Sequence, residues 1–394
     1  MYLTRIPHRV SNCLYPLSST FKHCPQAQHF RILCWILVLL ILCQGSATLK
    51  NLTRFMPRSL RYWTILRMVR AQYWDTQVLI HELAKDVLLT MPPPRDSTLY
   101  LIADLTIKGK TGEKQPLAHL TRMNQYQHFT FGISMLLLIA QWGRFRIPLD
   151  AAVLDPAKKG DQNIQFRNML RRFRPPAWCR KVIVVADAGF ASKANLKLIQ
   201  RKGYYFVFAL ARTWKLADGT HLRDLARYLP KSLYQRVASY LPDLRRKDYW
   251  VFLRRGKLKV IGEVTILLSK RRRNSGPKQV KLIVTNLEEA TATQILNAYA
   301  RRWSVEVMFK ELKTHLHMGQ MQVTKEAGRV KRAMMFPVLA YLLLLRLYGR
   351  ELDPEKGASL FELKQRFTME VFKEQADRSE NKWRKKLEKL QAAA

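Results

Sequence analysis

The chain has 394 residues, 48% of them hydrophobic, which is long enough for two or three domains and excludes a wholly disordered protein. It carries 69 Lys and Arg residues against 29 Asp and Glu residues, a formal net charge of +40. Because a polyanion relieves the self-repulsion of such a chain, the charge indicates a nucleic acid partner, with an anionic membrane surface as the alternative.

The first part of the chain is predicted to be helical. Residues 1–30 are polar, contain Pro and Ser, and are expected to be poorly ordered. Residues 31–94 follow as a helical domain, with helix starts at Ser46 and Ser59 and basic side chains between the apolar ones. Short basic helices suit a DNA-binding domain, and Pro92-Pro93-Pro94 ends it as a linker.

One segment of this domain raises the question of a membrane. The run from Ile32 to Cys43 is apolar without a break, and Gly45-Ser46-Ala47 follows it, which resembles the core of a signal peptide. Twelve residues are too few to span a bilayer, and the preceding segment is long for a signal peptide, so a buried helix fits better. The five cysteines have no zinc-site spacing and are expected to be free thiols in a reducing compartment, the cytoplasm: Cys13, Cys24, Cys34, Cys43 and Cys179.

A mixed α/β region over residues 95–212 comes next. Its predicted elements are a strand over Leu99–Asp104, a hairpin over His128–Arg146 that turns near Trp142-Gly143, a strand over Val182–Asp187, a helix over Ser192–Lys202 and a strand over Tyr204–Leu210. Continuous apolar runs of this kind are typical of strands buried on both faces of a sheet. His128 is interpreted as a structural residue of the hairpin.

Residues 213–287 are predicted to form a β-rich insertion, with strands over Tyr249–Phe252, Lys259–Leu268 and Gln279–Val284. Its basic turn, Arg271, Arg272 and Arg273, is predicted to contact DNA phosphates, with a solvated face as the alternative. Residues 288–348 hold a helix from about Ala290 to His317 and an apolar core helix over Pro337–Tyr348. Residues 349–394 form a charged tail that is helical from Glu362.

Two acids stand out because each ends an apolar strand. Functional groups gather at the carboxyl ends of strands in α/β sheets, so Asp104 and Asp187 are expected to meet at one edge if their strands are parallel neighbours. Two carboxylates that close need a cation between them, and Mg²⁺ is bound in this way. The alternative is two unrelated aspartates in turns.

The helix that starts near Ala290 carries a third acid. Tyr299, Arg302, Glu306 and Lys313 are spaced by three, four and seven residues, so they share one stripe of the helix. An adjacent apolar face can pack on the sheet and bring Glu306 to the two aspartates. The alternative is an ordinary amphipathic helix with i,i+4 pairs. His315 and His317 point in different directions on a helix and are not expected to bind a metal together.

These residues resemble the signature of a known family. The pattern Tyr-x2-Arg-x3-Glu-x6-Lys is typical of bacterial insertion-sequence transposases of family four, and here it reads Tyr299-AR-Arg302-WSV-Glu306-VMFKEL-Lys313. Asp104-Leu-Thr is similar to the family's first acidic motif, and Asp187-Ala-Gly-Phe to its second. The resemblance covers about residues 95–345.

The resemblance implies a ribonuclease-H-like catalytic core interrupted by a β-rich insertion, with Asp104, Asp187 and Glu306 as ligands of two Mg²⁺ ions, which Mn²⁺ can replace. It also implies DNA contacts by four residues, with phosphates for the first three and base stacking for the last: Tyr299, Arg302, Lys313 and Trp303. The expected activity is DNA strand cleavage and strand transfer at the ends of a mobile element. Relatives often carry an aromatic residue where Val280-Lys281 stands here, which puts a DNA hairpin intermediate in question.

The resemblance further implies that the chain works as a homodimer on double-stranded DNA, both the inverted repeats at the element's ends and the target, on the bacterial nucleoid and not at a membrane. A tail stripe of Trp383, Leu387 and Leu390 could contact the second copy or fold back on its own core. The competing functions are a nuclease or Holliday-junction resolvase on the same fold, a catalytically silent DNA-binding protein derived from a transposase, and a membrane-anchored basic protein.

Overall fold

The computed structural model of the protein describes residues 6–15, 17–18, 28–56, 62–70, 74–110, 115–123, 128–240, 245–321, 323, 326–353 and 356–391. The α-helices of these residues are α1 (His8–Leu14), α2 (Gln28–Leu42), α3 (Leu49–Thr53), α4 (Tyr62–Arg70), α5 (Thr76–Thr90), α6 (Asp161–Arg172), α7 (Lys193–Arg201), α8 (Leu222–Tyr228), α9 (Ala292–Ala300), α10 (Trp303–His315), α11 (Ala327–Tyr348) and α12 (Leu360–Gln391). Short 3₁₀ turns are η2 (Ala188–Phe190), η3 (Lys231–Leu233), η4 (Pro277–Gln279) and η5 (Gly349–Glu351).

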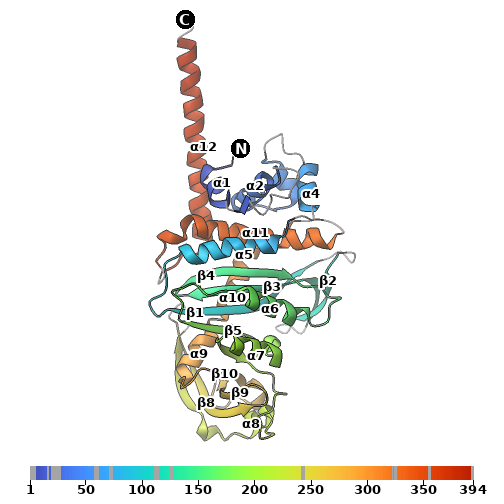
Figure 1. The fold of residues 1–394 in the computed structure, drawn as a ribbon, viewed down its shortest axis with the longest axis vertical. Coiled ribbons are helices and arrows are strands. Elements are labelled where there is room, and N and C mark those ends of the chain that lie inside the picture. The colour runs from blue at the N-terminus through green and yellow to red at the C-terminus, as the bar shows by residue number, and fades with distance from the viewer. Residues whose placement is uncertain are drawn as a thin grey trace.

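The strands of the described residues form one mixed ten-stranded sheet, which crosses the middle of the molecule (Figure 1). They are β1 (Thr98–Gly109), β2 (Ala118–Met123), β3 (His128–Trp142), β4 (Phe145–Val153), β5 (Lys181–Ala186), β6 (Tyr205–Ala209), β7 (Gln235–Tyr240), β8 (Arg246–Leu258), β9 (Gly262–Lys270) and β10 (Lys281–Thr285). Their order is β2-β3-β1-β5-β6-β10-β9-β8-β7, and β4 pairs with the second half of β3.

Strand β1 lies at the centre of the half of the sheet formed by β1 to β6. It pairs antiparallel with β3 on one side and parallel with β5 on the other. Strand β6 continues parallel to β5, and β10 pairs antiparallel with β6. The apolar runs are buried, since Val182 to Ala186 of β5 are at most 5% exposed, which is the pattern expected of a strand covered on both faces.

Helices cover the sheet and continue the core above it. Helices α6 and α7 pack on β3 and β6, and α9 and α10 pack on β5, β6 and β1. Helix α5 packs on β4 and on the long apolar helix α11, which contacts α2 in turn, so α11 and α5 connect the amino-terminal helices to the sheet (Figure 1). The predicted helix over Ser192–Lys202, the strand over Tyr204–Leu210 and the turn at Trp142-Gly143 are confirmed.

The amino-terminal prediction is confirmed in one part and wrong in another. The apolar run is a buried helix, as expected, because the side chains from Ile32 to Ile41 in α2 are at most 3% exposed. No helix among the described residues has the length and apolar character needed to cross a membrane. Within residues 1–30, for which poor order is expected, the structure has the helix α1, where Val10 and Leu14 are fully buried; residues 1–5, 16 and 19–27 lie outside the described residues.

The β-rich insertion extends the main sheet instead of forming a separate layer. Strand β9 pairs antiparallel with β10, and β8 and β7 follow outward. The strand β7 was not predicted, because Gln235–Tyr240 lacks a clear apolar alternation. Asn297 of α9 holds β7 in place, since its Oδ1 accepts hydrogen bonds from the Ser239 hydroxyl at 3.0 Å and the Tyr240 amide at 2.8 Å.

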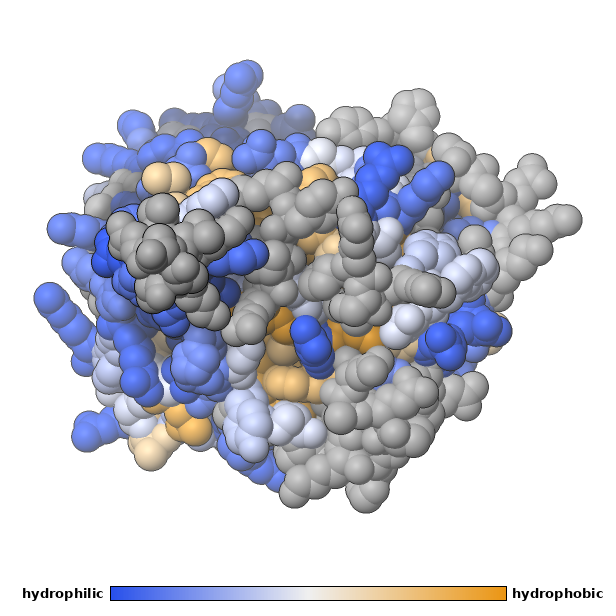
Figure 2. All heavy atoms as spheres, turned by 90° about the horizontal axis from the view of Figure 1, so that it is seen from above, coloured by the Kyte–Doolittle hydropathy of each residue, from blue (hydrophilic) through white to orange (hydrophobic). Residues whose placement is uncertain are grey.

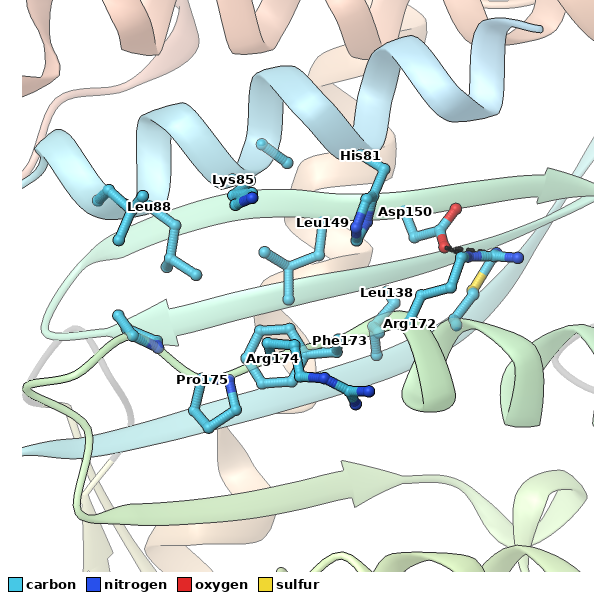
Figure 3. A pocket seen from close by; sticks show the side chains of 14 residues that line it. His81, Lys85, Leu88, Leu138, Leu149, Asp150, Arg172, Phe173, Arg174 and Pro175 are labelled. Atoms are coloured by element: carbon cyan, nitrogen blue, oxygen red, sulfur yellow. Dashed lines mark hydrogen bonds and ion pairs between the residues drawn. The ribbon is translucent and has the colours of Figure 1, made fainter.

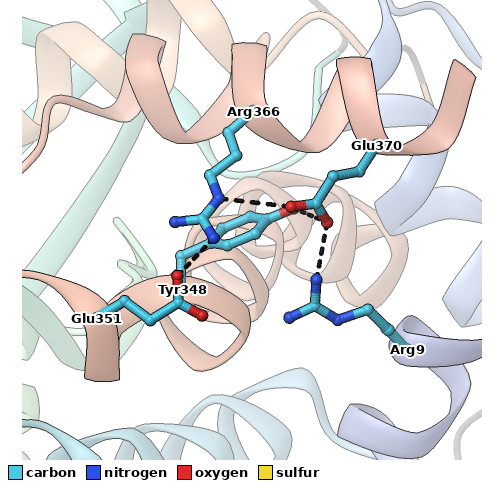
Figure 4. A network of polar contacts seen from close by, with 5 residues as sticks. All are labelled: Arg9, Tyr348, Glu351, Arg366 and Glu370. Atoms are coloured by element: carbon cyan, nitrogen blue, oxygen red, sulfur yellow. Dashed lines mark hydrogen bonds and ion pairs between the residues drawn. The ribbon is translucent and has the colours of Figure 1, made fainter. Parts of the chain in front are cut away.

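The tail is helical, as predicted, and α12 projects from the body as a 32-residue rod (Figure 1). A network at its base ties it to α1 and α11 (Figure 4). Arg9 and Tyr348 both donate to Glu370 Oε2 at 2.9 Å, and the guanidinium groups of Arg9 and Arg366 lie 5.8 and 4.4 Å from the Tyr348 ring. Arg366 also pairs with Glu351.

Among the described residues, those visible at the end of the molecule near α12 are mostly hydrophilic, with a smaller apolar area between them (Figure 2). A cavity of about 440 Å³ lies between α2, α3 and α12, where Leu42, Phe55 and Phe372 line it. Two of the tail's apolar residues, Phe367 and Val371, are buried, and α12 contacts α2, α10 and α11, so the base of α12 belongs to the core.

Candidate active site

The two predicted aspartates lie side by side on neighbouring strands. The parallel register of β1 and β5 pairs Ala103 with Ala186, and the next residues are Asp104 and Asp187. Asp187 directly follows β5, as expected. Asp104 does not end its strand, because β1 continues to Gly109 and keeps its pairing with β3. The apolar run that predicted the strand ends at Asp104, but the hydrogen-bonded pairing with β3 continues to Gly109.

The third acid is brought to the sheet by two short helices instead of the single predicted helix. Helix α9 starts with a capping box in which Thr291 and Gln294 exchange hydrogen bonds, and it ends at Ala300. A turn at Arg301 and Arg302 leads into α10, which begins at Trp303. Both turn residues keep near-helical dihedral angles, so the stripe from Tyr299 to Glu306 still faces the sheet.

Arg302 stands between two of the three acids. Its Nη1 donates to Asp104 Oδ2 at 2.7 Å, and its Nη2 pairs with Glu306 Oε1. The side chains of Arg302 and Asp104 are each 17% exposed and that of Glu306 is 23% exposed, so these charges interact with little screening by solvent. The guanidinium therefore binds both carboxylates at once, as a cation shared between them.

The environment of Asp104 weakens its acidity. The pKa of Asp104 is raised to about 6. Burial is the largest cause of the rise, and the charges of Glu306 and Asp187 add to it, while the charge of Arg302 and the hydrogen bond from the Leu105 amide oppose it. Raised pKa values from a cluster of acids are a common feature of functional sites. The site thus concentrates carboxylates in a half-buried place, where a bound proton or a cation such as Arg302 neutralises their charge.

Tyr299 and Lys281 surround the other aspartate. The Tyr299 hydroxyl donates to Asp187 Oδ1 at 3.4 Å, and burial together with Asp187 raises the pKa of Tyr299, so it stays a donor. The ammonium of Lys281 lies 4.5 Å from the centre of the Tyr299 ring, and Asp187 opposes the lowering of the Lys281 pKa by burial. Lys281 was not predicted as a site residue. Its position as a lysine at the start of the apolar strand that precedes Glu306 in the chain is the sequence feature that could have indicated it.

The remaining predicted DNA contacts are spread over the surface. Lys313 does not reach the acids: its Nζ donates to the carbonyl of Ile107 at 3.1 Å, farther along β1. Trp303 is 55% exposed at the start of α10. The basic turn lies in the insertion, where Arg271 and Arg273 are exposed and stack 5.7 and 5.3 Å from the rings of Tyr249 and Trp250, with Arg272 exposed between them.

The arrangement fits a metal ion by its donors. Within the described residues no three His, Cys, Asp or Glu side chains are grouped closely enough to hold a metal. Arg302 forms ion pairs with both Asp104 and Glu306. The donor set is carboxylate oxygen, which suits Mg²⁺ and Mn²⁺. Two of these carboxylates already converge on one cationic group. His317 takes no part, since its Nε2 lies 3.0 Å from the Cys43 carbonyl.

A second cavity, of about 190 Å³, lies between α5, β4 and the end of α6 (Figure 3). Asp150 is buried at its wall and accepts hydrogen bonds from Arg172 Nη2 at 2.6 Å and Gln77 Nε2 at 2.8 Å. Burial raises the pKa of Asp150, and Arg172 opposes the rise. A single carboxylate paired in this way holds α5 and α6 to the sheet and needs no ligand to explain it.

Comparison with known proteins identifies a family for this chain. The profile of the Transposase DDE domain family matches residues 118–343, which include Asp187, Arg302 and Glu306, while Asp104 precedes the matched segment. The cryo-EM structure of a piggyBac transposase synaptic complex with hairpin DNA is similar over 93% of this chain and 77% of that chain, with a TM-score of 0.49 and 9% sequence identity. No curated protein sequence matches the chain. Because the family profile covers more than half of the 394 residues, the chain belongs to the transposase DDE domain family.

Proposed function

We propose that the protein cleaves DNA at the ends of an insertion sequence and transfers the freed 3′ ends to a target DNA. The observation that carries this proposal is the convergence of Asp104 and Glu306 on Arg302, with Asp187 next to Asp104 on the neighbouring strand. Three acids from β1, β5 and α10 are the side chains that a metal-dependent phosphoryl transferase requires. The family, which is that of a transposase domain, supports this reaction over other uses of three acids.

The topology supports a ribonuclease-H-like core. Strands β4, β3 and β1 form an antiparallel meander, β5 and β6 continue parallel to β1, and the chain leaves after β6 for a β-rich insertion before it returns as β10. The interruption falls between the second and third acids, which is where the resemblance to insertion-sequence transposases of family four puts it.

The three carboxylates Asp104, Asp187 and Glu306 would hold two Mg²⁺ ions, or Mn²⁺ in their place. Bound divalent ions supply Lewis-acid activation of water and stabilise the charge on the attacking and leaving oxygens. Arg302 neutralises the acids until then and can turn its planar fork to a DNA phosphate. Tyr299 keeps a hydroxyl donor beside Asp187, which can hold a phosphate oxygen in the same way.

The DNA would cross several surfaces. We place the terminal phosphates on Tyr299, Arg302 and Lys313 and a base against the exposed ring of Trp303. The turn Arg271–Arg273 would contact the backbone farther out, in the insertion of residues 213–287. The basic helices of residues 31–94 are proposed to bind the element's inverted repeats.

Transposition joins two ends, so we propose a homodimer that holds both, on the nucleoid in the bacterial cytoplasm. Light scattering with and without paired element-end DNA measures this directly. A protein that completes strand transfer as a monomer on one end would contradict the dimer.

Strand cleavage and strand transfer can be separated in one assay. A labelled duplex with the inverted repeat that flanks the gene is incubated with Mg²⁺ and a supercoiled target plasmid. We expect a nicked 3′ end and its covalent product with the plasmid, and no product with Asp187→Asn. Cleavage without joining would indicate a nuclease on the same fold, and binding without cleavage would indicate a silent DNA-binding protein.

A further inference from the structure

Three lysines gather where β1 and α10 run past the acids. Lys108 and Lys110 follow Asp104 at the end of β1, and Lys313 lies two turns after Glu306 on α10. The ammonium of Lys313 donates to the Ile107 carbonyl at 3.1 Å, and that of Lys110 donates to the Gly319 carbonyl at 3.0 Å. All three side chains are half-buried.

The turn after α10 is shaped to let Lys108 pass. Gly319 has a φ of +78°, and a Cβ built there would lie 2.4 Å from Lys108 Cγ, so only glycine fits. Hydrogen bonds from two other segments also hold the turn: the Ala47 amide donates to Gln320 Oε1 at 3.1 Å, and Lys364 Nζ donates to the His315 carbonyl at 2.9 Å. The lysines are therefore held in place before any ligand arrives.

Positive charge is uncompensated at this place. Among the described residues, none of the three lysines forms an ion pair with a carboxylate, and the hydrogen-bond acceptors of Lys110 and Lys313 are neutral carbonyls. Burial lowers the pKa of Lys110 and of Lys313, and the charge of Lys108 lowers both further. Half-buried like charges without a counter-ion are unfavourable, and a bound anion relieves both the burial and the repulsion.

We propose that Lys108, Lys110 and Lys313 form a binding site for a DNA phosphodiester next to the acids. The inference deepens the proposed function and depends on it, and it adds Lys108 and Lys110 to the expected DNA contacts. Ile107, which Lys313 contacts, lies three residues beyond Asp104 on the extended strand, or about 10 Å away. The site would therefore hold a phosphate next to the one being cut and align the strand with the carboxylates.

The salt dependence of DNA binding tests this site. Each lost phosphate contact reduces the slope of log K against log salt by about 0.9. We expect Lys108→Gln and Lys110→Gln each to lower the slope by this amount on a mixed-sequence duplex followed by fluorescence anisotropy, and the double variant to lower it by about 1.8. Glutamine keeps a donor for the Gly319 carbonyl, so the fold is retained, and Lys110→Arg, which keeps the charge, should keep the slope.

Lys181, exposed at the start of β5, provides the matched control, because it lies at the opposite end of that strand from Asp187, about 20 Å away. Lys181→Gln removes one lysine charge far from the acids and should leave the slope unchanged. An unchanged slope in the Lys108 and Lys110 double variant, or an equal loss in Lys181→Gln, would overturn the proposal.

The same duplex, incubated with Mg²⁺, separates this inference from the proposed function. A wild-type protein that cleaves while the double variant keeps its slope rejects the lysine site alone. A wild-type protein that never cleaves rejects the proposed function, while a lowered slope in the double variant still supports a phosphate site.

Discussion

Replacing Arg302 by glutamine tests whether this side chain neutralises the acids. The change removes two hydrogen bonds between charged groups, each worth about 1.5–3 kcal/mol, and glutamine can restore one weaker bond. We therefore expect a loss of about 2–4 kcal/mol of the free energy of unfolding, since the partners are largely buried. With an unfolding entropy of about 2.1 cal/mol/K per residue, the melting temperature should fall by about 2–5 °C for 394 residues.

The effect of Mg²⁺ makes this prediction specific to the site. If Asp104 and Glu306 hold the ion as proposed, Mg²⁺ must displace Arg302 in the wild type but not in Arg302→Gln. A ligand at ten times its Kd stabilises a protein by about 1.4 kcal/mol. Added Mg²⁺ should therefore stabilise the variant more than the wild type and narrow the difference in melting temperature, measured by differential scanning fluorimetry.

The pair Arg384–Glu380 supplies the control, because it has the same i,i+4 spacing as Arg302–Glu306 but is well exposed on α12. An exposed pair contributes about 0.3–0.5 kcal/mol, so Arg384→Gln should shift the melting temperature by less than about 1 °C. The reasoning is refuted if Arg302→Gln melts with the wild type, or if Mg²⁺ leaves their difference unchanged.

Three further predictions concern other parts of the molecule. Asp104→Asn and Glu306→Gln should each lower the rate of Mg²⁺-dependent cleavage by at least about 10³-fold without weakening DNA binding, because no repulsion of phosphate is added; a variant that still cleaves is not a ligand position. Burial raises the pKa of Asp150 above 3.8, so the folded state binds the carboxyl proton more tightly than the unfolded state does. The free energy of unfolding should therefore fall as the pH rises above about 3.8 and the folded carboxyl loses its proton. Urea unfolding of Asp150→Asn at about pH 4 and about pH 7 should therefore show a smaller pH effect than the wild type, and an equal effect would exclude Asp150 as its source. Deleting residues 379–394 keeps the buried base of α12, so the melting temperature should stay within about 1 °C while the dimer on paired DNA ends is lost; light scattering that still finds the two-end complex eliminates this segment as the dimer contact.

Local patterns predicted the elements that form the site better than they predicted its details. The apolar runs located β1, β5 and β6, and their parallel order brought Asp104 beside Asp187 as expected. The predicted length of β1 was wrong, since Leu105 to Gly109 also pair with β3. The prediction followed the continuous apolar run, which stops at Asp104, although the alternation of apolar and polar residues after it is also typical of a strand.

The helix stripe was predicted by its spacing, but the partners of its members were not. The spacing predicted that Arg302 and Glu306 share one face of the helix. In the structure they form an ion pair with each other, and Arg302 also pairs with Asp104. The partner of Lys313 is a backbone carbonyl far along the chain, which no spacing encodes. The contact of Lys281 with Tyr299 also depends on the folded sheet, because β10 lies next to β6 only there.

The position of β10 also bears on how the chain is made. It lies between β6 and β9, so the strands made before it form two separate sheets that share no hydrogen bond until residues 281–285 are in place. A chain still on the ribosome, or one stopped before residue 281, exposes two open strand edges, which are templates for aggregation. Glu306 follows β10 in the chain, so a truncated protein that lacks the last acid also lacks the strand that closes the sheet.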